Sequence, residues 1–187
     1  MAPISTAEFK TGMTIDLDGG LFQISDFQHV KPGKGGAFVR TTLKNIRSGA
    51  SVDRTFRAGE KLEQAIIDKT DMQYLYHDGT MYVFMNTDTY EQLEVSPEVL
   101  GSATNYLIEA SNIQMLMYGD EIVGVEMAAS IVLEVADADP GMQGDRVSAA
   151  RKPATMRTGL VVQVPLFVET GQSIKVDTRS GEYIERA

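Results

Sequence analysis

Short stretches in which hydrophobic residues alternate with polar ones run through most of the chain, separated by turns rich in Gly, Asn and Asp. Alternation with a period of two is typical of β-strands that turn one face toward a core. The stretches fall into three successive groups, within residues 1–64, 65–127 and 128–187. The pattern therefore predicts an all-β protein of three small β-barrels, with these ranges as its domains.

The groups differ in the barrel that they predict. The first contains five expected strands, at residues 14–17, 21–30, 38–46, 51–56 and 62–67, and fits an SH3-like barrel. In the second group, Ser96 as N-cap and Pro97 in the first helical position predict a helix that continues to about Ala110. Strands interrupted by one short helix are typical of an OB-type barrel. The third group repeats the strand spacing without the helix and predicts another OB-type barrel.

The loop at residues 31–37 joins two of the expected strands and has the composition of a tight, exposed hairpin tip. Pro32 fixes its own φ, and the three glycines of the loop can adopt positive φ without a steric clash. Lys34 lies between two glycines, so no bulky neighbour buries its ammonium group. We expect a cation that is open to phosphate, to a modifying enzyme or, as at most such tips, only to water. The loop lacks the spacing of a nucleotide-binding P-loop.

The net charge of −9 is unevenly spread, with +2 in residues 1–64, −10 in 65–127 and −1 in 128–187. Residues 29–57 contain one acid, Asp53, and seven cations: Lys31, Lys34, Arg40, Lys44, Arg47, Arg54 and Arg57. One basic end on an acidic protein argues against general coating of nucleic acid and favours an oriented encounter with phosphate. The alternative is that the acidic middle only maintains solubility.

The sequence offers little for catalysis, cofactors or metals. Cys is absent, and the two histidines lie in different thirds of the chain, so neither a Ser/His/Asp arrangement nor a histidine metal cluster is predicted. Asp137, Asp139 and Asp145 do not fit the spacing of an EF-hand. We therefore expect no catalytic residue, no cofactor and no metal. Aromatic residues alternate at Tyr74, Tyr76, Tyr82 and Phe84, which suits base stacking but more often marks a barrel core.

The N-terminus lacks a basic segment followed by an apolar one, and there is no run of 18 apolar residues. The sequence thus predicts neither a secretory signal nor a membrane span, and we expect a cytoplasmic protein with no membrane partner.

Several stretches resemble the bacterial elongation factor P family. They are the loop Lys31-Pro32-Gly33-Lys34-Gly35-Gly36-Ala37-Phe38, the C-terminal signature from Lys152-Pro153-Ala154 through Gly159 to Gly171, and the run from Ile174 to Tyr183. Runs in the middle group, Met72-Gln73-Tyr74-Leu75-Tyr76 and Phe84-Met85-Asn86, are also similar. The resemblance spans the whole chain, and its signatures are long and spaced.

The resemblance implies an SH3-like (KOW-type) domain followed by two OB domains, in an L shape similar to tRNA. It also implies a monomeric translation factor, not an enzyme, that binds the 70S ribosome, with its rRNA and ribosomal proteins, between the peptidyl-tRNA and exit sites. There it would stimulate peptide-bond formation when synthesis stalls at consecutive prolines. Proline is a constrained nucleophile, and reactivity falls steeply when the peptidyl-tRNA is misaligned.

By the same resemblance, Lys34 reaches the CCA end of the peptidyl-tRNA and is the target of a modifying enzyme in many relatives. The residues that support its loop are Lys31, Pro32, Gly33, Gly35 and Gly36. The basic residues that face the tRNA backbone are Arg40, Lys44 and Arg47. On the side of the small subunit and the codon lie Gly144, Asp145, Tyr183 and Arg186, with Arg146 where many relatives have Thr.

Two other functions compete with this interpretation. OB domains alone suggest a module that binds single-stranded nucleic acid without the ribosome, although the charge of −10 in residues 65–127 would repel a phosphate backbone. An enzyme that forms a Schiff base through Lys34 would need a desolvated amine, whereas flanking glycines predict an exposed one.

Overall fold

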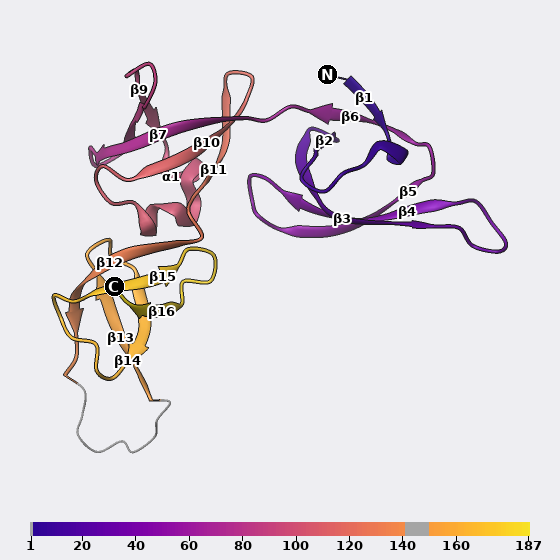
Figure 1. Ribbon diagram of the computed structural model, residues 1–187. Coiled ribbons are helices and arrows are strands. Elements are labelled where there is room, and N and C mark those ends of the chain that lie inside the picture. The colour runs from indigo at the N-terminus through magenta and orange to yellow at the C-terminus, as the bar shows by residue number, and fades with distance from the viewer. Residues whose placement is uncertain (1, 141–149) are drawn as a thin grey trace. The chain divides into compact units, whose positions relative to one another are not determined.

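A computed structural model describes residues 2–140 and 150–187 of the chain. Almost all of its regular structure is β, arranged in three antiparallel sheets (Figure 1). The predicted all-β class with three β domains is confirmed, while the exact boundaries at residues 64 and 127 stay a prediction. Compact packing divides the chain into two units, one formed by Met1–Thr70 with Leu116–Gly124 and the other by Asp71–Met115 with Val125–Ala187.

The first sheet has six strands in the order β1-β6-β2-β3-β4-β5. They are β1 (Ala2–Ser5), β2 (Thr14–Leu17), β3 (Gly20–Val30), β4 (Phe38–Asn45), β5 (Ser51–Arg57) and β6 (Lys61–Ala65). Five were expected from the sequence, and β1 is an addition that pairs with β6. The sheet curls around a core of Ile4, Phe9, Ile15, Ile24, Val39, Leu43 and Phe56.

The same compact unit contains a second, smaller core beside the first sheet. Leu21, Ala65 and Val123 are buried together there, and Ile46, Ile67, Leu116 and Tyr118 pack against them. Gly124 lies close to the turn after β4, because a Cβ at this position would meet the Ile46 carbonyl oxygen at 3.5 Å. Residues 116–124 are therefore held on the first sheet by apolar packing.

The second sheet has the order β11-β10-β7-β8-β9. Its strands are β7 (Asp68–His77), β8 (Tyr82–Asn86), β9 (Gln92–Val95), β10 (Asn112–Tyr118) and β11 (Glu121–Glu126). A bulge between Tyr74 and Tyr76 breaks the expected aromatic alternation. Tyr74 and Phe84 are buried, whereas Tyr76 is 48% exposed.

The helix predicted from Ser96 to about Ala110 is much shorter than expected. The α-helix α1 covers only Pro97–Leu100 and is followed by the 3-10 helix η2 (Gly101–Tyr106). Pro97 takes the expected first position, but the Ser96 side chain makes no capping hydrogen bond. Gly101 has φ +52° and ψ −130°, a conformation that ends the α-helix. Burial of Leu100, Ala103 and Tyr106 then fixes the tighter helical turn that follows.

The third sheet has the order β14-β13-β12-β15-β16. Its strands are β12 (Ser130–Ala138), β13 (Arg151–Met156), β14 (Val161–Pro165), β15 (Ser173–Asp177) and β16 (Tyr183–Arg186). β12 extends to Ala138, so Asp137 lies in a strand, opposite Thr155. Valines dominate the core of this barrel, and Tyr106 of η2 is buried with them.

None of the helices in the described part of the chain has the length and apolarity that a membrane span requires. Residues 2–140 and 150–187 likewise contain no group of three acidic, histidine or cysteine side chains placed to hold a metal ion. Asp145, one of the three aspartates considered above, lies outside the described residues.

Candidate functional site

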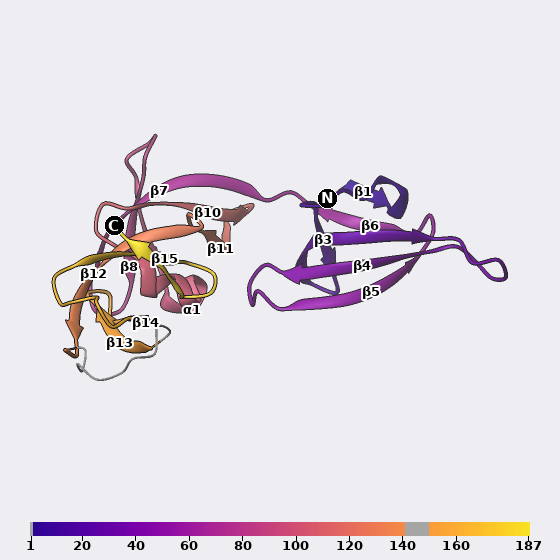
Figure 2. The same ribbon diagram turned by 60° about the horizontal axis from the view of Figure 1, so that its bottom comes forward.

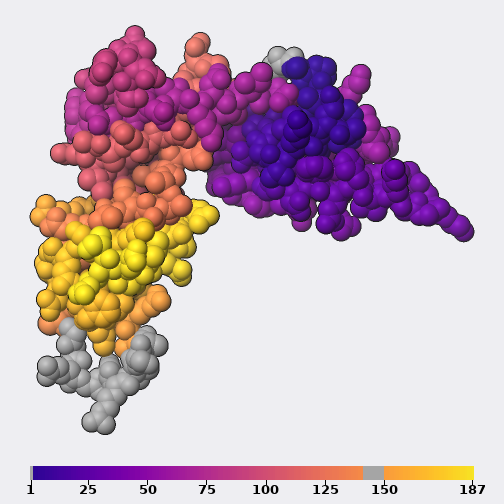
Figure 3. Space-filling model, in the orientation of Figure 1, coloured from indigo at the N-terminus to yellow at the C-terminus, as the bar shows by residue number. Residues whose placement is uncertain are grey.

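The loop at residues 31–37 forms the tip of the β3–β4 hairpin, which extends away from the rest of its sheet in both ribbon views (Figure 2). In the space-filling view the tip stands clear of the body of its unit (Figure 3). Every residue from Lys31 to Gly36 is exposed, and Lys34 makes no hydrogen bond or ion pair with another described residue. The exposed amine predicted at this position is what the structure has.

Only one of the three loop glycines has the backbone conformation that requires glycine. Gly35 has φ +118°, whereas Gly33 and Gly36 do not adopt positive φ. A Cβ at Gly35 would meet only Pro32 Cγ, at 3.8 Å, so the restriction comes from the backbone angle and not from lack of space. The turn that exposes Lys34 therefore depends on the glycine that follows it.

A short series of hydrogen bonds anchors the base of this loop. The Ala58 N–H donates to the Ala37 carbonyl oxygen at 3.0 Å, which ties the β5–β6 turn to the end of the loop. Thr6, fully buried, holds this turn from the other side: its hydroxyl donates to the Arg57 carbonyl at 3.2 Å and accepts from the Gly59 N–H at 2.9 Å. The N-terminal segment thus fixes the end of the barrel from which the loop starts.

Aromatic packing stiffens the hairpin below the loop. Phe9 contacts both Phe27 and Phe56 edge to face, with ring centroids 6.2 and 5.9 Å apart. The row continues toward the tip, because Phe27 contacts His29 edge to face at 5.7 Å. Lys31 follows two residues after His29. The long hairpin is therefore supported by side chains on one face for most of its length.

The opposite face of the hairpin carries the basic residues. Along β4, Val39, Thr41 and Leu43 are buried, so the alternating positions Arg40 and Lys44 point outward and are exposed. Neither makes an ion pair with another described residue. Two of the three residues predicted to face a tRNA backbone thus lie on one surface, on the same strand.

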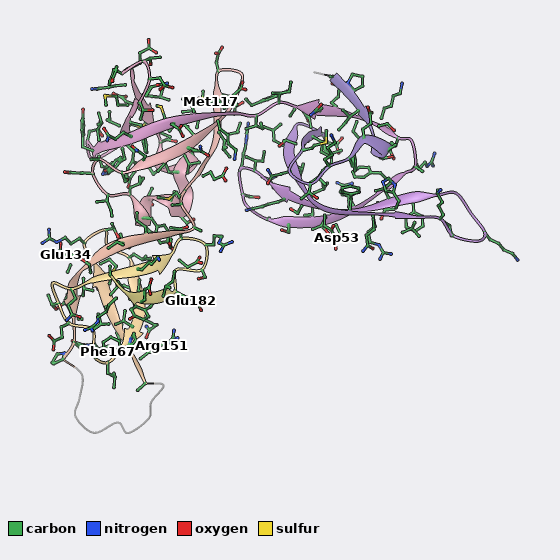
Figure 4. The ribbon with its side chains drawn as sticks, in the orientation of Figure 1. Asp53, Met117, Glu134, Arg151, Phe167 and Glu182 are labelled. Carbon is green, nitrogen blue, oxygen red and sulfur yellow. The ribbon has the colours of Figure 1, made fainter. Side chains whose placement is uncertain are left out.

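This surface is not uniformly basic. Thr42 lies between Arg40 and Lys44, and its partners on the two neighbouring strands are Asp26 and Asp53. The Thr42 hydroxyl donates to the Asp53 carboxylate at 2.8 Å, and Figure 4 shows Asp53 on the outer side of β5. A row of two acids therefore separates the two cations. Asp26 was missed because it precedes the basic stretch, and only the strand register brings it to this face.

Arg47, the third residue predicted to contact a tRNA backbone, does not lie on this surface. Arg47 is in the turn after β4, and its guanidinium forms an ion pair with Glu121 at 2.5 Å. Both side chains are more than half exposed. Arg54, another member of the basic stretch, pairs with the buried Thr41 and so belongs to the other face of the hairpin. The seven cations of residues 29–57 therefore do not form one continuous patch.

The residues expected on the codon side fall into two sets. Gly144, Asp145 and Arg146 lie outside the described residues. Tyr183 packs against the core of the third barrel, while Arg186 is exposed and lies over the ring of Phe167, with its Cζ 5.3 Å from the ring centroid. Sequence reasoning did not single out Phe167, although an aromatic residue just after the strand-like run that ends at Pro165 was a usable signal.

The carboxylates with a lowered pKa hold turns of the second and third sheets. The backbone N–H groups of Met81 and Thr80 lower the pKa of Asp78. Those of Ser180 and Arg179 lower the pKa of Asp177 in the same way. Burial raises the pKa of Tyr106, with a further rise from the nearby Asp177 carboxylate. These shifts follow from turn and core structure, so they do not indicate a catalytic centre.

Comparisons with known proteins cover nearly the whole chain. Residues 5–62 match the elongation factor P (EF-P) KOW-like domain, residues 67–125 the elongation factor P (EF-P) OB domain, and residues 131–186 the elongation factor P C-terminal domain. The chain is 52% identical over 184 residues to an elongation factor P from Moorella thermoacetica, covering 98% of this chain and all of that one. It is 51% identical over 182 residues to an elongation factor P from Corynebacterium urealyticum, covering 97% of each.

A solved structure is also similar. The chain resembles a eukaryotic translation initiation factor 5A from Methanococcus jannaschii, with a TM-score of 0.52 and 26% identity, covering 68% of this chain and 92% of that one.

Proposed function

This chain belongs to the elongation factor P family of translation factors, and we propose that it acts by placing Lys34 against the CCA end of a peptidyl-tRNA on the ribosome. The observation that carries the proposal is the exposed, unpaired Lys34 at the end of a hairpin whose base is held by hydrogen bonds and aromatic packing. A cation on such a support can contact a phosphate backbone without losing much conformational freedom.

The family consists of translation factors and not of enzymes, so Lys34 has a positioning role and the ribosome supplies the chemistry. Orientation alone can contribute several kcal/mol to a reaction, about 7–11 kcal/mol in well-aligned systems. Proline gains most from this help because its ring restricts its approach to the peptidyl ester. We therefore propose that the protein relieves stalling at consecutive prolines, from a site between the peptidyl-tRNA and exit positions.

The remaining contacts follow from the same placement. Arg40 and Lys44 would each meet a phosphate of the tRNA, since both point outward from β4 and are four residues apart, about 13 Å along the strand. Arg47 would contribute only by giving up its ion pair with Glu121. Lys31, Pro32, Gly33, Gly35 and Gly36 would shape the loop around Lys34, and Lys34 would be the target of a modifying enzyme.

At the other end of the chain, Gly144, Asp145, Tyr183 and Arg186 would face the small subunit. We further propose that the factor works as a monomer in the cytoplasm, with domain boundaries near residues 64 and 127.

Reconstituted translation of a message with three consecutive prolines tests the proposal. Lys34→Ala should leave the fold intact, because the side chain is exposed and unpaired, and should abolish the acceleration of proline incorporation. Lys10→Ala is the matched control, since Lys10 is also an exposed lysine of the first unit but lies off the hairpin. Equal acceleration by the wild type and Lys34→Ala would refute the role of Lys34. Tight binding of free single-stranded RNA, without the ribosome, would favour a general OB-type binding module.

A further inference from the structure

Phe167 is a large aromatic residue that lies at the surface and does not belong to the core of the third barrel. It lies in the turn after β14, where the Val168 N–H donates to the Pro165 carbonyl oxygen at 3.1 Å. Leu166 and Phe167 are the central residues of this turn, which usually holds small or polar residues. The Phe167 side chain is 57% exposed, although the next residue, Val168, is fully buried. The buried valine fixes the turn, so the ring is held outward in a defined place.

One arginine lies over this exposed ring, and a second lies at the same end of the barrel. The guanidinium of Arg186, from β16, lies over the Phe167 ring with its Cζ 5.3 Å from the centroid. Arg151 is the first residue of β13 and pairs with Pro165, which precedes Phe167 by two residues. Figure 4 shows the side chains of Arg151 and Phe167 at the same end of the barrel. Within residues 2–140 and 150–187, neither arginine forms an ion pair. The ring therefore has a planar cation on it and a second cation nearby.

We propose that Phe167 and Arg186 form a stacking site for one unpaired RNA base, with Arg151 placed to contact the adjoining phosphate. The inference rests on the proposed function, which brings the protein to an RNA-rich particle. Unpaired bases stack on aromatic rings and on guanidinium planes, and the phosphate of the same nucleotide is anionic. The site offers both kinds of partner and a cation for the phosphate. It adds Phe167 of the third barrel as a residue that would stack on an RNA base.

A base fits this site better than an apolar protein surface does. If an apolar protein surface covered this ring, the guanidinium of Arg186 would lose its hydration and gain no negative charge as a partner, which is unfavourable. A nucleotide supplies that counter-charge through its phosphate. Stacking is also tolerant of which base is present, so the site predicts binding strength and not sequence preference.

The experiment measures the Kd of the full-length protein for 70S ribosomes that carry an mRNA and a peptidyl-tRNA. Phe167→Leu keeps apolar volume but removes the ring, and we expect it to raise the Kd about 10-fold. Phe167→Tyr keeps the ring and should bind within about twofold of the wild type. Val161→Ala is the matched control, because Val161 is also 57% exposed and lies on β14 of the same barrel, so the change should leave the Kd unchanged.

A second measurement identifies the ligand directly. Irradiation of the complex at short ultraviolet wavelength should cross-link the base to the ring, and mass spectrometry should find a nucleotide adduct on Phe167. Two results would overturn the stacking site, provided that the wild type binds the ribosome. One is a Kd for Phe167→Leu equal to that of the wild type, and the other is an equal loss of affinity in the Leu and Tyr variants. Absence of ribosome binding by the wild type would instead refute the proposed function, and this site with it.

Discussion

Thr6 offers a direct test of how the base of the Lys34 loop is held. Its buried hydroxyl is the donor to the Arg57 carbonyl oxygen and the acceptor for the Gly59 N–H. Thr6→Val keeps the shape of the side chain and removes both hydrogen bonds. A buried backbone group left without its partner costs about 1–3 kcal/mol. Arg57 and Gly59 are themselves exposed, so water can partly replace the lost hydrogen bonds. We therefore expect the free energy that keeps the turn closed to fall by about 1–2 kcal/mol.

Amide hydrogen exchange of the full-length protein measures this loss where it occurs. A cost of about 1–2 kcal/mol should speed exchange at Gly59 and Ala58 by a factor of about 5–30, because the turn opens more often. The Ala58 N–H is bonded to the Ala37 carbonyl, so its exchange reports on the connection to the loop itself. Proline-dependent translation should fall in parallel, as Lys34 becomes less well positioned.

Thr6→Ser is the control, because it keeps the hydroxyl and loses only a methyl group. It should exchange at Ala58 and Gly59 nearly as slowly as the wild type. If the Ser variant exchanged as fast as a destabilised Val variant, loss of the methyl group alone would be enough to loosen the turn, and the hydrogen bonds of Thr6 would not be what holds the loop base. If neither variant changed exchange at Ala58, the N-terminal segment would have no part in positioning Lys34.

Three further predictions concern single features of the structure. Gly35→Ala should cost the loop conformation about 1–3 kcal/mol, because φ is +118° there, and should reduce proline-dependent translation; Gly33→Ala should have no effect, and equal losses from the two variants would contradict this. A double-mutant cycle on Arg47 and Glu121 should give a coupling below about 1 kcal/mol that shrinks with added salt, because both side chains are more than half exposed; a coupling that persisted at high salt would show that the pair is not screened by water. The backbone N–H groups of Ser180 and Arg179 lower the pKa of Asp177 in the folded state, so its carboxylate stabilises the fold above the ordinary aspartate pKa and this contribution disappears as the pH falls through the lowered pKa. The difference in unfolding free energy between the wild type and Asp177→Asn should therefore shrink on acidification, and a constant difference from neutral to acid pH would contradict the assignment.

The hairpin shows how far local sequence reaches. The alternating residues of β3 and β4 and the Gly-rich loop between them were enough to predict two long strands and an exposed Lys34. The predicted helix shows where local rules fail. Ser96 and Pro97 gave the correct start, but Gly101 ended the α-helix and burial of Tyr106 in the third core set what followed. Start signals are local, whereas the length of a short helix depends on its packing.

The all-β class, most of the strands and the exposure of Lys34 could be predicted from the sequence alone, because period-two alternation and turn residues act over a few neighbouring positions. Which charges share a surface could not be predicted in this way, because it depends on how the strands pair and pack. Register placed Asp26 and Asp53 beside Thr42, between the two outward cations of β4, and folding brought Glu121 to Arg47 and Arg186 to Phe167. These pairs are far apart in the chain or on different strands, and a contact of that kind exists only once the strands are aligned.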